Sequence, residues 1–493
     1  MDVGFFGVWN DFKGITYDQV YQEDVLMKKQ SFPRAIGASS MGFTAVLTFA
    51  LAMLSGCEDG IQHLFTAKKI PLKGRRISLY GMESQTREKD LFSPAKTQVS
   101  PSPVVLWGQA GLNAQHHMGS CALEGSMAWP LVPVWFASVF GDATLPVSPV
   151  TSQQHVFVVD NMGAVSAFDW HGKRVWSVQV NRNRSFFGMG GGLATDGQTL
   201  YVTTPTGLVL ALNCCTGKRL WQHTLNYPAR NGPALLDHRL AIITLANQIV
   251  MLDARTGKEL WEVQGFKDDT MVLGGSVPGM TSDCVVVGTG SGEVLALSLE
   301  RGDRLWEQQL GTLVLEGEKN FRHIHACPVI VGKSVYIASE SGKLVCFDLL
   351  SGEVVWSQDI HSGQTPVVLG DGLVTVTANG TCLALDRHTG KELWEVRVSQ
   401  QKRLFGPIVA GGLIYVLSEN GQLYGLDPAK KGKKVLVQSL KRTYTLAPIA
   451  VRGGLLFFSK NGTLSFCKRQ ASPKPVNPSR SGVGPGLIPG LKK

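Results

Sequence analysis

The sequence predicts an all-β protein: an eight-bladed β-propeller with four-stranded antiparallel blades, whose ring is closed by an N-terminal strand. Three observations predict this fold. A short segment that ends in tryptophan recurs through the chain, and alternating apolar runs precede each copy. The last copy lacks its final strand, while an unpaired strand lies upstream of the first. Because an open ring leaves unpaired strand edges, the upstream strand is expected to complete the last blade.

The recurring segment gives the number of units. Its copies end at Trp176, Trp221, Trp261, Trp306, Trp356 and Trp394, which lie 38 to 50 residues apart. A constant period of this size indicates a repeat of one supersecondary unit. A seventh copy spans residues 421–436 with Leu436 in place of tryptophan, and an eighth strand pair lies within residues 446–467.

Each unit has the same internal order. Runs such as Leu413–Ser418 alternate apolar residues, as a strand in a packed sheet does. A second strand ends at a polar residue such as Asp386, and a Thr-Gly or Ser-Gly pair follows. The carboxylate is expected to accept backbone N–H groups in that turn. The final strand ends at the large tryptophan ring, which we expect to pack between sheets.

The strand around Trp135 lies 41 residues before Trp176 and has no partner of its own upstream. We therefore assign it to the eighth blade, which places the propeller at residues 131–469. The remaining regions are of a different kind. Residues 57–130 are predicted to be a tether, and residues 470–493, rich in Pro, Gly and Ser, a disordered tail.

The N-terminal region resembles a secretory signal. Residues 27–56 carry a basic start, an apolar stretch from Phe43 to Leu54 and then Ser55-Gly56 before Cys57. The apolar stretch is too short for a typical membrane span. We interpret Met27 as the true start, with residues 1–26 an over-extended gene prediction. Leu-Ser-Gly-Cys resembles a bacterial lipobox, so Cys57 is the candidate site for lipid anchoring by acyl chains such as palmitate. The alternative is an ordinary buried cysteine after a cleaved signal.

Net charge and motifs exclude several function classes. The chain carries +10 at pH 7, but residues 107–467 hold 30 Lys and Arg against 28 Asp and Glu. A nearly neutral propeller is not expected to bind nucleic acid. We find no phosphate-binding loop, nucleophile elbow, paired-carboxylate motif or zinc-type cysteine pair, and His116-His117 is a weak metal signal. We expect no enzymatic activity, cofactor, metal or small-molecule substrate.

The cysteines divide into two groups. Four fall within predicted strands and are expected to act as small apolar residues: Cys284, Cys346, Cys382 and Cys467. The adjacent pair Cys214-Cys215 is different, because adjacent cysteines pair only through a strained ring, and its redox state stays open.

The repeat resembles a known superfamily. Residues 211–221 and 384–394 match the pattern A-x-D-x-x-T-G-x-x-x-W of quinoprotein-like propellers, with Asn213 replacing Asp in the first. Together with the lipobox, the tether and eight units, the chain resembles the BamB family, lipoproteins of the outer-membrane β-barrel assembly machine. Residues 74–78 and 107–109 also resemble the longer members of that family.

The resemblance implies a non-catalytic scaffold, lipid-anchored on the periplasmic face of the cell outer membrane. Such a scaffold binds the POTRA domains of BamA, joins other subunits and assists insertion of β-barrel proteins. The family's partner-binding loops fall on two segments of this chain: Met271, Val272, Leu273 and Gly274, and His323, Ile324 and His325. Leu273 stands where an arginine is expected, and the histidines stand where carboxylates are expected. The alternative is that both segments are ordinary loops between blades.

Two other functions remain open. A pyrroloquinoline quinone-dependent dehydrogenase shares the eight-bladed ring and uses a vicinal disulfide, which gives Cys214-Cys215 weight. Against it, the pair lies in a turn expected on the outer part of the ring, and the repeated turns account for the aspartates. A lipid-anchored sensor or polysaccharide-binding propeller is also compatible with the repeats, because fold does not determine function.

Overall fold

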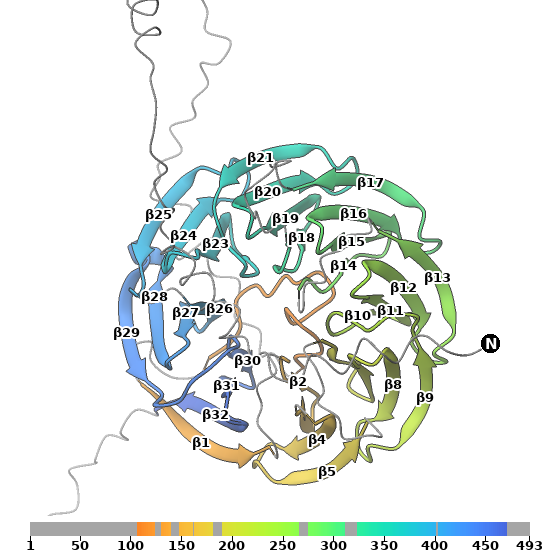
Figure 1. The fold of residues 1–493 in the computed structure, drawn as a ribbon. Coiled ribbons are helices and arrows are strands. Elements are labelled where there is room, and N and C mark those ends of the chain that lie inside the picture. The colour runs from red at the N-terminus through yellow and green to blue at the C-terminus, as the bar shows by residue number, and fades with distance from the viewer. Residues whose placement is uncertain are drawn as a thin grey trace, which may run out of the picture. The chain divides into compact units, whose positions relative to one another are not determined.

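The computed structural model describes residues 106–123, 130–139, 147–160, 162–180, 190–265, 275–310, 323–400 and 403–470. These residues form eight four-stranded antiparallel sheets arranged as blades around a central axis (Figure 1). This confirms the predicted all-β, eight-bladed propeller. One 3-10 helix, η1 (Pro428–Lys430), interrupts the strands. Within the described residues, no helix is long and apolar enough to cross a membrane.

The first four blades each take four consecutive strands, ordered from the innermost to the outermost. They are blade 1, β2 (Val150–Thr151), β3 (His155–Val159), β4 (Ala164–Asp169) and β5 (Arg174–Gln179); blade 2, β6 (Gly192–Thr195), β7 (Thr199–Thr203), β8 (Leu208–Asn213) and β9 (Arg219–Thr224); blade 3, β10 (Ala234–Leu236), β11 (Arg239–Ile243), β12 (Gln248–Asp253) and β13 (Glu259–Gln264); and blade 4, β14 (Gly279–Met280), β15 (Cys284–Gly288), β16 (Glu293–Ser298) and β17 (Arg304–Gln309).

Blades 5 to 7 follow the same order, whereas blade 8 takes its outermost strand from the N-terminal side. They are blade 5, β18 (Val329–Val331), β19 (Ser334–Ala338), β20 (Lys343–Asp348) and β21 (Val354–Asp359); blade 6, β22 (Val367–Leu369), β23 (Gly372–Val376), β24 (Thr381–Asp386) and β25 (Glu392–Arg397); blade 7, β26 (Leu404–Ala410), β27 (Leu413–Ser418), β28 (Gln422–Asp427) and β29 (Lys433–Ser439); and blade 8, β30 (Ile449–Val451), β31 (Gly454–Phe458), β32 (Thr463–Arg469) and β1 (Leu131–Ser138).

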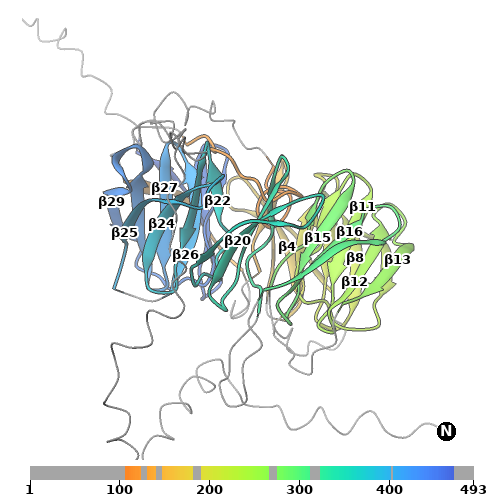
Figure 2. The same cartoon turned by 90° about the horizontal axis from the view of Figure 1, so that it is seen from above.

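Burial follows the position of a strand within its blade. The second strands are buried at every residue, as in β15 and β31, or at all but the first, as in β7, because neighbouring blades cover both faces of the sheet (Figure 2). The outermost strands alternate between exposed and partly buried residues, as in β5 and β9. The strand periodicity in the sequence therefore reflects packing between blades as well as pairing within them.

Blade 8 joins the two ends of the propeller. Strand β1 pairs antiparallel with β32, with Trp135 opposite Phe466. The ring of Trp135 lies 6.0 Å from that of Phe466, centroid to centroid. The strand that contains Trp135 thus supplies the outermost strand that the eighth repeat lacks in sequence order.

The closing tryptophan of one blade docks on the Asp-Thr-Gly turn of the next. Trp306 Nε1 donates to the carbonyl oxygen of Leu349 at 2.8 Å. A Cβ atom added at Gly352 would lie 2.6 Å from the Trp306 ring, so only glycine leaves room for the indole. The same N–H to carbonyl bond, 2.9 to 3.1 Å long, recurs at four further tryptophans: Trp176, Trp221, Trp261 and Trp356.

The turn that receives the indole is held by its aspartate. Asp253 Oδ1 accepts hydrogen bonds from the backbone N–H groups of Arg255 and Thr256 and from the Thr256 hydroxyl. The sequence predicted this role for the carboxylate, and the structure confirms it. Because the turn is fixed, its glycine and its carbonyl are already positioned for the tryptophan of the preceding blade.

Blade 7 lacks the tryptophan and uses a different contact. Leu436 occupies the position and is buried. Two residues later, the Gln438 side chain accepts a hydrogen bond from Leu131 N at 2.9 Å and donates to Leu131 O at 2.7 Å. Two hydrogen bonds from the Gln438 side-chain amide to β1 therefore join blades 7 and 8, where the repeat has leucine in place of tryptophan.

Residues 107–123 line the inner edges of the blades, and we call them the axial segment (the orange chain inside the ring in Figure 1). Its backbone or side chains bond to the first strands of blades 1, 2, 3, 4, 5 and 7 in chain order. The contacts run from Trp107 with Thr151, Gly108 with Thr195, Gln109 with Leu235, Ala114 with Met280, Gln115 with Ile330, to Cys121 with Val409 and Gly411.

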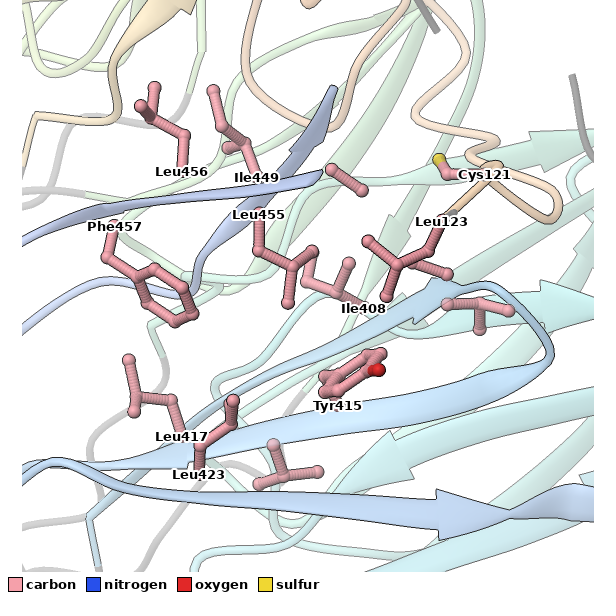
Figure 3. Close-up of a cluster of buried hydrophobic side chains, with 14 of the residues drawn as sticks. Cys121, Leu123, Ile408, Tyr415, Leu417, Leu423, Ile449, Leu455, Leu456 and Phe457 are labelled. Carbon is pink, nitrogen blue, oxygen red and sulfur yellow. The ribbon is translucent and has the colours of Figure 1, made fainter. Parts of the chain in front are cut away.

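Burial explains why the axial segment is ordered against the blades. Sequence analysis placed it in the tether of residues 57–130, but Trp107, Cys121 and Leu123 are at most 7% exposed. Cys121 and Leu123 join the core shared by blades 7 and 8 (Figure 3). The first strand of every blade has a free edge facing the axis, and these backbone groups need partners. The folded unit therefore begins earlier than the first strand.

The docking glycine provides a matched test. Gly352 and Gly332 both have positive φ, +71° and +60°, but no atom lies within 4 Å of a Cβ atom added at Gly332. We expect Gly332→Ala to lower the free energy of unfolding by about 1–2 kcal/mol, the cost of a left-handed alanine. Gly352→Ala adds overpacking against Trp306 and is expected to cost about 1–3 kcal/mol more. Urea denaturation of both variants measures the difference, and equal losses would contradict indole docking.

His116 provides a pH-dependent test of the axial segment. Its side chain is fully buried, Nδ1 donates to Pro328 O at 2.8 Å, and burial lowers its pKa from 6.5 to about 4. Between these pH values, His116 is therefore protonated in the unfolded chain and neutral in the folded chain. We expect this group to lower the free energy of unfolding by ~3 kcal/mol as pH falls from 7 to 4.

The variant His116→Asn keeps a donor for Pro328 but cannot titrate. Its loss of unfolding free energy between pH 7 and pH 4 should be smaller by that amount in denaturant titrations. The exposed His171→Asn is the control. An unchanged pH dependence in His116→Asn would contradict the assignment.

Candidate functional site

The connections between blades gather on one face of the ring. In each antiparallel blade, the turn between the second and third strands and the connection to the next blade lie at the same end of the strands. We call this end the loop face. The Asp-Thr-Gly turns lie on the opposite face. The predicted partner-binding residues His323, Ile324 and His325 lie on the loop face, in the connection before blade 5.

The segment before blade 5 is anchored to blade 4. His323 Nδ1 bonds to Gly290 O at 2.6 Å, and Ile324 N donates to Thr289 O at 3.4 Å. Ile324 is fully buried, and a Cβ atom at Gly288 would lie 2.6 Å from its side chain. His325 is the residue of the three that reaches the surface, with its side chain 27% exposed. Ile324 is therefore a packing residue, and His325 is the accessible one.

The segment Met271, Val272, Leu273 and Gly274 lies outside the described residues. The residues that follow it are described and lie next to the histidines. Val277 N donates to Cys327 Sγ at 3.4 Å, two residues beyond His325. The structure thus brings the end of one predicted segment close to the other.

Arg230, which sequence analysis did not select, lies close to His325 and to Gly275, the first described residue after the segment Met271–Gly274. It comes from the connection before blade 3 and is 1% exposed. Cβ atoms added at Gly275 and Gly290 would lie 2.6 Å and 3.1 Å from its guanidinium group. The two glycines therefore make room for a long buried cation. Burial lowers the pKa of Arg230 to about 10, so it remains charged at neutral pH.

The histidine beside Arg230 is neutral. Burial, followed by the charge of Arg230 and the proximity of His323, lowers the pKa of His325 to about 4. The two imidazole rings lie edge to face, with centroids 6.2 Å apart. His325 Nε2 lies 4.0 Å from Glu340 Oε2, and burial raises the pKa of Glu340. We call Arg230, His323, Ile324, His325 and Glu340 the loop-face cluster.

The adjacent cysteines lie away from this cluster, in the docking turn between β8 and β9. Cys214 is buried, its Sγ lies 3.3 Å from Thr195 Oγ1, and its carbonyl accepts the Trp176 indole N–H. Cys215 is exposed, and both thiols are free. The cysteines in strands, including Cys284 and Cys382, are buried as predicted. Among the described residues, no three His, Cys, Asp or Glu side chains come together as metal ligands.

Comparison with known proteins identifies the family. The model of the family described as outer membrane protein assembly factor BamB matches residues 161–396 and 351–452. The chain belongs to the BamB family.

Individual BamB proteins support the assignment. The assembly factors BamB of Yersinia pestis and of Escherichia coli K12 are each 26% identical to this chain, over 343 and 341 residues, covering 67% of this chain and 87% of each relative. The crystal structure of BamB from Moraxella catarrhalis matches with a TM-score of 0.61 and 22% identity, over 69% of this chain and all of that one.

Enzymes share the architecture. The quinohemoprotein alcohol dehydrogenase of Comamonas testosteroni matches with a TM-score of 0.60 and 13% identity, covering 82% of this chain and 85% of that one. At this identity the likeness shows the fold alone, since one fold carries many functions.

The complete burial of Ile324 predicts a large effect of its substitution on stability, in contrast to an exposed apolar residue on an outer strand. Ile324→Ala should lower the free energy of unfolding by about 2–5 kcal/mol, because it empties a fully buried site between blades 4 and 5. Leu305→Ala, on the outer strand β17 and 49% exposed, should cost less than about 1 kcal/mol. Denaturant titration compares the two variants. A small loss at Ile324 would mean that this residue is free to face a partner.

Proposed function

We propose that this protein is a non-catalytic scaffold of outer-membrane β-barrel assembly. Membership of the BamB family carries this proposal, because the curated relatives are named as outer membrane assembly factors. A rigid ring suits the task, since loops fixed on a closed propeller lose little conformational entropy on binding.

We further propose that the loop face binds the POTRA domains of BamA. The supporting observations are that Arg230 lies beside Gly275, the first described residue after Met271–Gly274, and that His325 lies close to Arg230. Glu340 lies within 4.0 Å of His325 and is 46% exposed, so it offers a carboxylate where the family's acidic residues are expected. Neutral imidazoles and the apolar Met271, Val272 and Leu273 would supply contact area, and Glu340 would orient a basic partner.

Its location is part of the same proposal. Cys57 would carry the acyl chains that hold the protein on the periplasmic face of the outer membrane. Cys57 lies outside the described residues, so the lipobox pattern alone supports this. A cluster of acyl chains holds a protein far more firmly than a single chain.

A quinone-dependent dehydrogenase is the second candidate, supported by the shared fold and by Cys214-Cys215. Both features have a role that needs no quinone. The Cys214 carbonyl receives an indole N–H in blade docking, and the ring encloses the axial segment along the inner edges of its blades. Purified protein that oxidises alcohols with dye after addition of quinone and Ca²⁺ would overturn the scaffold assignment.

The partner site is tested by replacing its accessible residues. Leu273→Ala with His325→Ala should weaken recovery of BamA in pull-downs at least about tenfold, because central interface residues cost more than ~1 kcal/mol when truncated. Glu340→Gln should weaken it as well. Leu260→Ala with His223→Ala, both on the outer rim, is the matched control. Undiminished recovery with the first pair, at an unchanged unfolding midpoint, would remove these residues from the site.

A further inference from the structure

One position of the repeat separates two blades from the other six. The residue after the closing tryptophan points outward on the outermost strand. It is polar in blades 1 to 6: Ser177, Gln222, Glu262, Glu307, Ser357 and Glu395. In blades 7 and 8 it is Val437 and Phe136, which are 60% and 55% exposed. At this one position, the two neighbouring blades therefore present apolar side chains where the other six blades have polar or acidic ones.

Strand β1 extends this apolar rim. Val134 is 56% exposed and Val132 is 39% exposed, on the same outermost strand as Phe136. Exposed apolar residues on an edge strand favour aggregation unless another surface covers them. Strand β1 carries three such residues, whereas five other outermost strands carry one or two each: Val175, Leu220, Leu260, Leu305, Val354 and Val355. The larger number on β1 therefore suggests contact with an apolar medium or partner.

Charge is segregated at the same place. Residues 428–469 contain ten Lys and Arg and no Asp or Glu, whereas residues 107–427 contain 22 Lys and Arg against 28 Asp and Glu. Lys433, Lys434, Lys441 and Lys460 are exposed. The net charge of the propeller is therefore close to zero because a net negative charge on residues 107–427 is offset by a strongly positive sector at residues 428–469.

The basic and apolar side chains lie against each other. The Arg442 guanidinium lies over the Phe136 ring, 5.6 Å from its centroid, and Lys434 Nζ lies 5.7 Å from the centroid of the Tyr424 ring. Gln470 N donates to Pro130 O beside the same strand. The 23 residues that follow Gln470 contain Lys474, Arg480, Lys492 and Lys493 and no acidic residue. The described chain therefore ends beside this sector, and the sequence that follows carries four further cations.

We propose that this rim, formed by Val132, Val134, Phe136, Val437, Lys433, Lys434, Lys441 and Arg442, binds the surface of a membrane that contains anionic lipid. Valine and phenylalanine side chains enter the boundary between headgroups and acyl chains, and the lysines approach lipid phosphates. The lysines of this sector are flexible and have no carboxylates between them in the sequence. Such an arrangement suits mobile lipid headgroups, whereas a binding site for an acidic protein is expected to present charges in fixed positions that pair with those of the partner. The contact goes beyond the scaffold role and is independent of the loop-face cluster.

The experiment measures vesicle binding without the proposed acyl anchor. The full chain carrying Cys57→Ser is sedimented with phosphatidylcholine vesicles, with or without one third phosphatidylglycerol. We expect binding to the anionic vesicles alone, and weaker binding as NaCl is raised. Equal binding to neutral vesicles, or no binding to anionic vesicles, would overturn the proposal.

Matched variants assign the binding to the rim. Lys433→Gln, Lys434→Gln and Lys441→Gln together should lower the partition coefficient roughly 100-fold, since each lysine near the surface contributes about fivefold. Val134→Ser with Phe136→Ser should also lower it, with less salt dependence. The control replaces Lys173, Lys218 and Lys258 with Gln. These exposed lysines occupy, in blades 1 to 3, the repeat position that Lys433 has in blade 7.

The outcomes separate this proposal from the partner site. Equal losses in the lysine variants and the control would indicate nonspecific charge attraction and overturn it. Unchanged vesicle binding by the rim variants, with reduced recovery of BamA, would identify the rim as a protein interface and also overturn it. Reduced vesicle binding with unchanged recovery of BamA and an unchanged unfolding midpoint would support it, whatever the fate of the loop-face cluster.

Discussion

The docking of an indole onto the turn of the next blade is the interaction on which the propeller depends. At five tryptophans the contact combines a hydrogen bond from Nε1 to a turn carbonyl with packing of the ring on a glycine. The aspartate of the turn holds the turn by local hydrogen bonds. These bonds offset the conformational entropy lost when the turn is ordered, independently of the indole. Because neighbouring blades are joined through such contacts, no blade buries its two faces alone. The repeat sequence therefore specifies a ring.

The inner and outer edges of each blade have different surroundings. The inner edges are met by the axial segment, which bonds to the first strands of six blades between Trp107 and Cys121. The outer edges stay at the surface. Most exposed side chains of strands such as β13 and β17 are polar or charged, and each of these two strands has one exposed leucine, Leu260 and Leu305. Blades 7 and 8 depart from this pattern on β29 and β1, and they are also the blades joined by Gln438 in place of an indole.

On the loop face, the predicted segment before blade 5 differs in chemistry from what the family resemblance implies. Histidines stand where carboxylates are expected, and burial beside Arg230 keeps His325 neutral. Glu340, from the turn between β19 and β20, lies beside His325 and restores a carboxylate to the surface. The same propeller backbone can carry different sets of side chains. The likeness to the dehydrogenases therefore shows a shared fold alone.

The sequence by itself determined the repeat, the order of strands and the docking turns, because period-two alternation and the Asp-Thr-Gly-Trp spacing are local signals. The family resemblance also led to the prediction that two segments, Met271–Gly274 and His323–His325, bind a partner. Only the tertiary structure decided that Trp107–Leu123 packs inside the ring, since the partners of these residues are free strand edges that exist only after the blades assemble. Likewise, no local pattern marks Arg230 or Glu340. Arg230 fits because Gly275 and Gly290 leave space for it, and Glu340 lies 4.0 Å from His325. Such proximity arises only when turns that are distant in the sequence share one face.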